Sequence, residues 1–318
     1  MSRSTISTFQ LFEKFPDAEA ARLYIEGRRW PKGAVCPACQ EAKRITARKG
    51  GFYRCNACRV DFTVRTGTIF ERSHVPLHKW LYAMYLLMTA RKGVSSLQLG
   101  KEIGITQKSA WFVLQRIREA CGNDPTVLSG IVEIDETYIG GKEKAKHASK
   151  KLRAGRGTVG KIPVMGMRER GKGGRTKAHP LTNTDTGSIH RAVHASVQTG
   201  STLHTDEHSA YNGLGGVFYD HEAINHRSGE YVRDGVTTNS IESVWAVLKR
   251  GLHGTYHHAS EKHLARYVNE FTFRLNDGDV KRHTLERLAS LVTASIGPRI
   301  TYKELTDEGG NAGNQRDH

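Results

Sequence analysis

The sequence has no apolar segment long enough to cross a membrane, and its first thirty residues show no apolar stretch behind a basic start. Its most apolar window, residues 77–88, contains His78, Lys79 and Trp80. That window falls short of the roughly 20 residues that a spanning helix needs. It therefore predicts a buried core helix, and the missing export signal predicts a cytoplasmic protein with no membrane partner.

Cysteine is scarce, with five residues in 318, and a reducing cytoplasm disfavours disulfides between them. Acidic residues are also few: 32 Asp and Glu stand against 48 Lys and Arg, which leaves a formal net charge of +16. This imbalance favours a polyanionic partner, because each phosphate that Lys or Arg neutralises releases condensed counterions. The chain shows no internal repeat, and its length suffices for two or three domains.

Much of the positive charge is concentrated in residues 142–177, which hold thirteen Lys and Arg, two Asp and Glu, and seven Gly. The glycines indicate a loop. One interpretation is a solvated, mobile loop; the charge density favours contact with the DNA backbone. The cations that we expect to contact DNA from this basic loop are Lys150, Lys151, Arg153, Arg156 and Lys161.

Four cysteines form two Cys-x-x-Cys pairs, Cys36 with Cys39 and Cys55 with Cys58, with fifteen residues between the pairs. Four thiolates at this spacing can surround one Zn²⁺ as a tetrahedron. Two disulfides are the alternative, which a reducing compartment disfavours. We predict a structural zinc that folds a ribbon too small to be stable alone. The fifth cysteine, Cys121, is expected to be a small buried hydrophobe.

Residues 95–111 show the pattern of two helices joined by a tight turn. Leu99 and Ile103 lie four residues apart on the first helix. Gly104 permits a sharp turn, and Thr106 can cap the second helix. A recognition helix in the major groove of DNA has this pattern, and so does a plain helical hairpin. We expect the second helix to contact DNA through Lys108, Arg116 and Arg118.

Three acidic residues define a candidate catalytic centre. Asp135 lies in the β-branched run 131–138, and Asp206 ends the short strand-like segment 202–206. Because burying a bare charge is costly, such carboxylates must be hydrogen-bonded, paired or bound to metal. Glu242 opens a helical segment, with thirty-five residues between it and Asp206. Three converging carboxylates can hold two Mg²⁺ ions roughly 4 Å apart, which activate the attacking oxygen and stabilise the leaving oxygen in phosphoryl transfer.

Glu242 has a second interpretation. Asn239 precedes it by three residues, as in a helix N-terminal capping box that needs no metal. Asp135 alone could likewise be an ordinary buried, hydrogen-bonded carboxylate. Lys249 favours the catalytic interpretation, because it lies two turns beyond Glu242, about 10 Å along the same helix face. We expect Lys249 and its neighbour Arg250 to contact DNA as well.

Several stretches resemble those of one known family. They are 62–68 after the cysteine pairs, Glu-Ile-Asp-Glu-Thr-Tyr-Ile-Gly-Gly-Lys at 133–142, His-Thr-Asp at 204–206, Asn-Ser-Ile-Glu-Ser-Val-Trp at 239–245, and 254–258. Together they make residues 15–278 similar to the insertion sequence 1595 family of transposases. The resemblance implies an RNase H-like catalytic fold, Mg²⁺ or Mn²⁺ as cofactor, and action on the terminal inverted repeats of a mobile element. The third metal ligand would be Glu242 or, with one less charge, Asn239.

We therefore expect a multidomain chain that acts on double-stranded DNA, both transposon ends and target, as a homo-oligomer. It would work in the bacterial cytoplasm, associated with the nucleoid when bound to DNA. The expected parts are an N-terminal helical segment (1–33), a zinc ribbon (34–70), a helix-turn-helix-like DNA-binding segment (71–124), an α/β RNase H-like catalytic domain (125–280) and a C-terminal helix with a polar tail (281–318).

Two rival functions fit parts of the pattern. A non-catalytic DNA-binding regulator, or a decayed transposase, would keep the ribbon and the helices and would be indifferent to mutation of Asp135. An RNase H-like nuclease would cut DNA and never join strands. The joint occurrence of acids, basic loop and binding modules favours a transposase.

Overall fold

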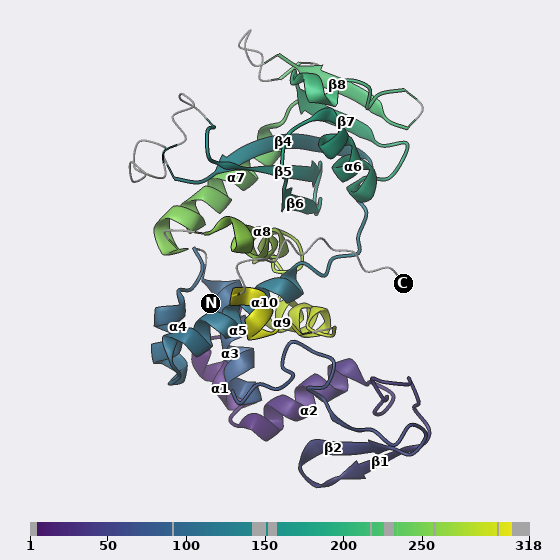
Figure 1. Cartoon of the computed structure of the whole chain (residues 1–318), viewed down its shortest axis with the longest axis vertical. Helices are drawn as coiled ribbons and strands as arrows, with labels where there is room; N and C mark the ends of the chain where they lie inside the picture. The colour runs from purple at the N-terminus through teal and green to yellow at the C-terminus, as the bar shows by residue number, and fades with distance from the viewer. Residues whose placement is uncertain are drawn as a thin grey trace. The chain divides into compact units, whose positions relative to one another are not determined.

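The computed structural model describes residues 5–90, 92–141, 151, 158–216, 218–225, 232–233, 235–256, 259–297 and 299–306 (Figure 1). The chain divides into two compact units. Unit 1 comprises Met1–Asn123 and Asp277–His318, and unit 2 comprises Asp124–Asn276. Within the described ranges, no helix is both long and apolar enough to span a membrane. The expected polar end of the tail, 307–318, lies outside the described residues.

Unit 1 contains a three-stranded antiparallel ribbon formed by β1 (Ile45–Arg48), β2 (Phe52–Cys55) and β3 (Asp61–Thr63). Its inner face packs an aromatic cluster in which Trp30, Tyr53 and Phe62 have ring centroids 5.4 to 5.7 Å apart. Tyr53 also donates a 3.0 Å hydrogen bond to Glu26 on α2 (Ala18–Arg29). The ribbon is therefore stabilised by the helix that precedes it as well as by its own cysteines.

The rest of unit 1 is helical. Its elements are α1 (Thr8–Lys14), α3 (Leu77–Thr89), α4 (Ser96–Ile103), α5 (Gln107–Cys121), α9 (Thr284–Ala294) and α10 (Tyr302–Thr306). The core helix expected at 77–88 is α3, in which Trp80, Leu81 and Met84 have no exposed surface. The C-terminal helix α9 packs against α3, and buried Arg287 donates a hydrogen bond to the Met88 carbonyl. Residues from both ends of the chain thus complete one core.

Helices α4 and α5 are joined by a tight turn. Gly104 ends α4 in the left-handed conformation (φ 64°), which costs glycine little. Thr106 caps α5 by accepting a hydrogen bond from the Ser109 backbone N–H. A Cβ at Gly100 would lie 3.0 Å from the Ile105 carbonyl oxygen, so glycine lets the two helices approach closely.

Unit 2 is built on a mixed five-stranded sheet in the order β6-β5-β4-β7-β8. Strands β4 (Ile131–Ile139), β5 (Ile162–Glu169) and β6 (Thr176–Pro180) form an antiparallel meander. Strands β7 (Thr202–Asp206) and β8 (Asp220–Ile224) continue the sheet in parallel with β4. The prediction that residues 142–177 form one basic loop is wrong in its second half, because β5 and the start of β6 occupy it. The glycine-rich composition concealed the apolar run of β5.

Helices cover both faces of this sheet (Figure 1). On one face α6 (Thr186–Ser196) packs on apolar side chains of β4, β5 and β7, including Ile134, Met165 and Leu203. On the other face α7 (Asn239–Gly251) and α8 (Glu261–Leu275) pack around Val164 and Ala178. Since side chains alternate along a strand, the α7 face of β4 receives Glu133 and Asp135, and the α6 face receives Ile134 and Glu136.

Candidate functional site

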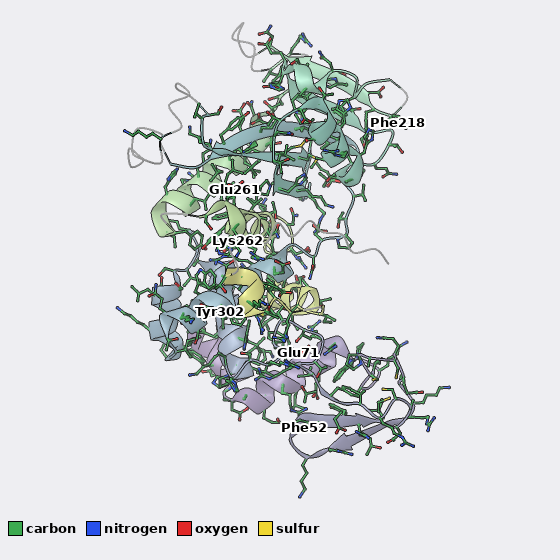
Figure 2. The ribbon with its side chains drawn as sticks, in the orientation of Figure 1. Phe52, Glu71, Phe218, Glu261, Lys262 and Tyr302 are labelled. Carbon is green, nitrogen blue, oxygen red and sulfur yellow. The ribbon has the colours of Figure 1, made fainter. Side chains whose placement is uncertain are left out.

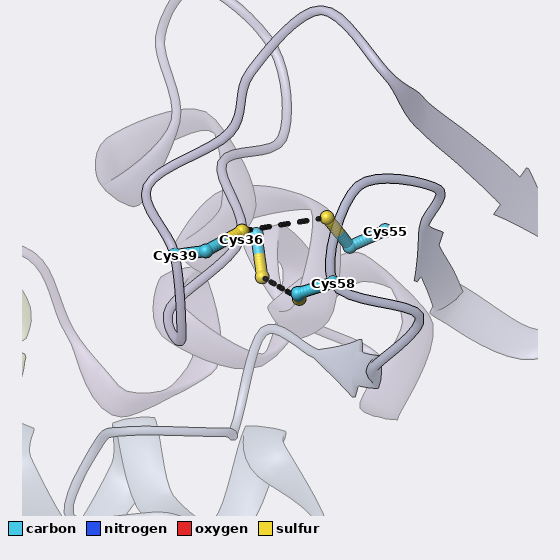
Figure 3. Close-up of side chains that lie close together, drawn as sticks. All are labelled: Cys36, Cys39, Cys55 and Cys58. Atoms are coloured by element: carbon cyan, nitrogen blue, oxygen red, sulfur yellow. Dashed lines mark hydrogen bonds between the residues drawn. The ribbon is translucent and has the colours of Figure 1, made fainter.

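The four paired cysteines of unit 1 form a compact cluster (Figure 3). The Sγ atoms of Cys36 and Cys58 lie 3.6 Å apart, as do those of Cys39 and Cys55. All four sulfurs lie within 4.8 Å of one another. A tetrahedral Zn²⁺ with Zn–S bonds of about 2.3 Å needs sulfurs roughly 3.8 Å apart. The donor set and its spacing therefore fit a zinc ion.

The knuckles act unequally on the thiols. Backbone N–H groups of Cys58 and Ala57 donate to the Cys55 sulfur and lower the pKa of this thiol to about 7. At Cys39 and Cys58, by contrast, contacts with neighbouring cysteine sulfurs outweigh the backbone donors and raise the pKa of both thiols. Thiolate is the form that binds metal. Cys121, by contrast, lies buried on α5, as expected.

The sheet of unit 2 brings Asp135 and Asp206 to adjacent parallel strands. Glu133 on β4 is in register with His204 on β7. The pairing of these two strands ends at Glu133 and His204, so each aspartate lies two residues beyond the last pair, on the same face of the sheet as Glu133. Both are partly buried.

Asp135 is held in a site that disfavours its charge. Burial, together with the charges of Asp206 and Glu242, raises the pKa of this carboxyl to about 6 against the opposing hydrogen bond from Trp245. That bond, from the indole Nε1 to Asp135 Oδ2, is 2.8 Å long. A cation would relieve the repulsion among the three carboxylates. The arrangement can therefore attract a divalent metal ion.

Glu242, Asn239 and Lys249 share the exposed face of α7, while Ile241, Trp245 and neighbouring apolar residues bury the opposite face. The charge of Glu242 contributes to the raised pKa of Asp135, as the smallest of its causes. Among the described residues, the cysteines are the one group with three or more possible ligand atoms within 4.8 Å of one another. Asp135, Asp206 and Glu242 do not form such a group in the described structure.

The capping-box alternative for Asn239 and Glu242 is wrong. Thr238 is the N-cap of α7, and Asn239 is already the first helical residue. No side chain at the N-cap position accepts a hydrogen bond from the helix. Glu242 contacts the hydroxyl of Thr238 at 3.3 Å instead. The Glu242 carboxylate therefore takes no part in a capping box at the start of α7.

Sequence reasoning missed the role of Glu133. This residue is 1% exposed, and its Oε2 accepts hydrogen bonds from the Ser240 N–H (2.8 Å), the Ser240 hydroxyl (2.5 Å) and the Ile241 N–H (3.2 Å). The other oxygen lies 3.3 Å from the Arg170 guanidinium. The signal was available: a second acid sits two residues before Asp135, on the same face of a buried strand.

Glu136 was also missed. It faces α6, where the Tyr211 hydroxyl donates a 2.6 Å hydrogen bond to Glu136 Oε1. Burial, together with the charges of Asp135 and Asp206, raises the pKa of this carboxyl to about 7 against the opposing hydrogen bond from Tyr211. The sheet therefore carries carboxylates on both faces at the level of Asp135.

The prediction that Arg116 and Arg118 contact DNA is wrong for this structure, because both are 1% exposed. The Arg116 guanidinium donates to the backbone carbonyls of Ile69, Glu71 and Ile300. Burial lowers the pKa of Arg116 to about 10. This arginine joins separate segments of unit 1, and the second half of α5 is a core helix rather than an exposed recognition face.

Other predicted DNA-contacting cations remain accessible. Lys108 is exposed at the start of α5, and its ammonium lies 4.6 Å from the ring centroid of Tyr302, labelled in Figure 2. Lys249 and Arg250 are exposed at the end of α7. Lys151 is exposed and Lys161 is partly exposed; Lys150, Arg153 and Arg156 lie outside the described residues.

The outer face of the ribbon was not predicted as a contact surface. Arg48 and Arg54 project from it, and both lie within 3.5 Å of Asp61. Phe52, labelled in Figure 2, is 53% exposed beside the hairpin turn. Further exposed cations surround this face: Lys43, Arg44, Lys49 and Arg59. We call Arg48, Phe52, Arg54 and these four cations the ribbon surface.

Comparisons with known proteins identify the family of the chain. Residues 127–276 match the ISXO2-like transposase domain, and residues 16–60 match the transposase zinc-ribbon domain. The chain is 32% identical over 260 residues to an uncharacterized protein in transposable element ISH50 of Halobacterium salinarum, with 77% of this chain and 86% of the relative covered. A four-cysteine ribbon followed by a mixed-sheet domain of this type defines a transposase. The chain belongs to the insertion sequence 1595 family.

One solved structure with some likeness is a chain of the simian T-cell lymphotropic virus intasome in complex with PP2A regulatory subunit B56 gamma. It is 14% identical, with 63% of this chain and 66% of that chain covered, and the TM-score is 0.28. A score this low does not define a common fold.

Proposed function

We propose that this transposase cuts the ends of its mobile element and joins them to target DNA by metal-dependent phosphoryl transfer. The observation that carries the proposal is the placement of Asp135 and Asp206 on adjacent parallel strands, with Glu242 on the helix that packs across the same face. An antiparallel three-strand meander extended by two parallel strands supports an RNase H-like catalytic fold.

Asp135, Asp206 and Glu242 would hold Mg²⁺ or Mn²⁺, which are hard cations that prefer oxygen ligands. When bound, a pair of such ions stabilises both the attacking and the leaving oxygen. The protein itself would orient the three carboxylates. The exposed face of α7 would leave them accessible to water and to DNA. Lys249, on that face, would pair with a DNA phosphate.

We favour Glu242 over Asn239 as the third ligand. The charge of Glu242 acts on Asp135, and a carboxylate binds Mg²⁺ more strongly than a neutral amide oxygen. Asn239 lies one turn earlier on the same face. It would replace Glu242 with the same mechanism and one less charge.

Double-stranded DNA is the proposed partner, as both element end and target. Unit 1 would bind it through the ribbon surface and Lys108, and unit 2 through Lys151, Lys161, Lys249 and Arg250. On the ribbon surface, six cations lie near two carboxylates: Asp61, which is ion-paired with Arg48 and Arg54, and Glu41, beside Lys43 and Arg44. This excess matches the phosphate backbone. The chain would assemble as a homo-oligomer on DNA, in association with the bacterial nucleoid.

The test is strand transfer by the purified full chain on a duplex that carries the element end, with Mg²⁺ or Mn²⁺. The variants are Asp206→Asn and a control, Glu222→Gln, which removes an exposed charge on the neighbouring strand β8. We expect joined products from wild type and control and none from Asp206→Asn. End binding without cleavage would support the regulator, and cleavage without joining would support the nuclease.

A further inference from the structure

We propose that Glu133 is a positioning residue: it anchors the start of α7 to the catalytic strand β4 and so sets where Glu242 stands relative to Asp135. This inference rests on the proposed metal site and adds a residue that does not itself touch metal or DNA. The supporting observation is the set of hydrogen bonds that Glu133 accepts from Ser240 and Ile241.

Glu133 makes the hydrogen bonds that an N-cap side chain normally makes at the start of a helix. The N–H groups of the second and third helical residues have no partner within a helix and are normally satisfied by the N-cap side chain. In α7 these residues are Ser240 and Ile241, and the N-cap Thr238 makes no such bond. The Glu133 carboxylate accepts from both N–H groups at 2.8 and 3.2 Å. A negative charge at a helix N-terminus also interacts favourably with the helix dipole.

The carboxylate comes from a distant strand, and this changes its effect. An ordinary cap orders only its own helix, whereas Glu133 fixes the first turn of α7 against β4. Glu242 follows Ile241 directly, and Asp135 lies two residues beyond Glu133 on the same strand face. On α7 the contact with Glu133 ends one residue before Glu242. On β4 Glu133 lies two residues before Asp135.

Arg170 makes the anchor rigid on its other side. Its Nε lies 3.3 Å from Glu133 Oε1, its backbone N–H donates to the Ile131 carbonyl, and its guanidinium donates to the Gly235 carbonyl in the segment before α7. A buried carboxylate is stable only when its hydrogen bonds are satisfied. Both oxygens of Glu133 meet this condition, so rotation of the side chain is opposed from two directions.

A second attachment holds α7 one turn later. Trp245 donates to Asp135, and its ring lies so close to β5 that a Cβ at Gly166 would be 2.4 Å from it. Gly166 pairs directly with Asp135 across β4 and β5. The helix therefore contacts the sheet on either side of Glu242 in sequence, at Ser240 and at Trp245. Loss of the Glu133 contact would leave the first turn of α7 held by the packing of Ile241 and by Trp245 alone, and the position of Glu242 would be less fixed.

The experiment measures Mn²⁺ binding by the zinc-loaded full chain, with free Mn²⁺ followed by electron paramagnetic resonance. The variants are Glu133→Gln, Ser240→Ala, Ser240→Thr and Asp206→Asn. Two matched controls are Ser243→Ala, an exposed serine on α7 that bonds the Ser240 carbonyl, and Glu222→Gln, at the same sheet level as Glu133. Thermal unfolding of every variant separates loss of fold from loss of geometry.

We expect Glu133→Gln to raise the Mn²⁺ dissociation constant about tenfold, as is typical when a residue that orients a metal ligand is changed. Ser240→Ala should raise the Mn²⁺ dissociation constant less. Ser240→Thr, which keeps the hydroxyl, and the two controls should have the wild-type dissociation constant. If Glu133→Gln does not fold, the comparison of Ser240→Ala with Ser240→Thr carries the test.

Two results would overturn the proposal in different ways. Wild-type Mn²⁺ affinity in folded Glu133→Gln and Ser240→Ala, with affinity lost in Asp206→Asn, would make Glu133 merely structural and leave the proposed function intact. Unchanged affinity in Asp206→Asn would remove the metal site itself, and with it the positioning role.

Discussion

Trp245 on α7 donates its indole N–H to the Asp135 carboxylate on β4, at 2.8 Å. The helix that carries Glu242 is thereby tied directly to the strand that carries the first proposed metal ligand. Because the bond favours the ionised carboxylate, it partly offsets the burial that raises the pKa of Asp135 to about 6. The relationship has consequences for both metal binding and packing.

Replacing Trp245 by Phe should weaken metal binding in a pH-dependent way. Phe keeps most of the ring volume and removes the N–H, so the pKa of Asp135 should rise above about 6. Metal must then displace a proton at neutral pH. We expect Mn²⁺ affinity at pH 7 to fall several-fold and to recover at pH 8.5. An affinity loss that is equal at both pH values would contradict the electrostatic explanation.

Replacing Gly166 by Ala should destabilise unit 2. The added Cβ would lie 2.4 Å from the Trp245 ring and 2.8 Å from Ile241, so the helix must shift. Overpacking of a core costs about 1–3 kcal/mol of unfolding free energy, which chemical denaturation measures. Gly187→Ala on α6 is the control, since its Cβ would make only an ordinary 3.6 Å contact with Asp185. Equal stability of the two variants would refute the close approach.

Replacing Cys36 by Ser should release the zinc and unfold the ribbon, because the cluster loses one of four ligands. Element-end binding should weaken, and the unfolding of unit 2 should not change. Zinc content per chain, measured by atomic absorption, checks the site. The control is Cys121→Ser, which alters a buried thiol on α5 outside the cluster. Retention of full zinc content by Cys36→Ser would exclude the four-cysteine site.

Two histidines of unit 2 should destabilise its fold as the pH falls below about 6.5, the ordinary histidine pKa, while proton uptake by Asp135 and Glu136, whose pKa values are raised in the fold, acts in the opposite direction. Burial lowers the pKa of His204 and of His221 in the folded chain, with Arg170 adding to the effect at His204. At these two histidines the unfolded chain binds protons that the folded chain rejects, so their protonation favours unfolding. Their contribution to stability is fully present above about pH 6.5 and is lost as the pH falls through their folded pKa values.

Urea denaturation between pH 7.5 and 5 measures this dependence. His221→Gln keeps a polar partner for the Thr205 hydroxyl, which His221 Nε2 contacts at 2.8 Å. It should flatten the curve. An unchanged slope would assign the acid sensitivity to other groups.

Much of the local structure could be predicted from sequence. The cysteine pairs indicate the ribbon, the core helix at 77–88 is α3, and Gly104 with Thr106 marks the turn between α4 and α5. These features depend on short-range rules: ligand spacing, apolar periodicity and capping. They are visible because each signal lies within a few residues along the chain.

Two of the errors share one physical cause, which is burial by distant segments. Arg116 has a polar side chain on an amphipathic pattern, and only the packing of Ile300 and residues 69–71 around α5 makes it a core residue. Asn239 and Glu242 have the spacing of a capping box, yet a carboxylate from β4 satisfies the helix start instead. Neither outcome can be inferred from neighbours in sequence.

By itself the sequence determined which residues can do chemistry: four thiols for zinc, three acids for a divalent metal, and an excess of cations for phosphate. The tertiary structure decided which of them meet. Parallel pairing of β4 with β7 puts Asp135 and Asp206 on the same face of the sheet, and the buried Glu133 and Trp245 contacts direct α7 toward them. Residue type follows from the chain alone, whereas proximity across seventy residues or more depends on strand register and on which charges the fold can afford to bury.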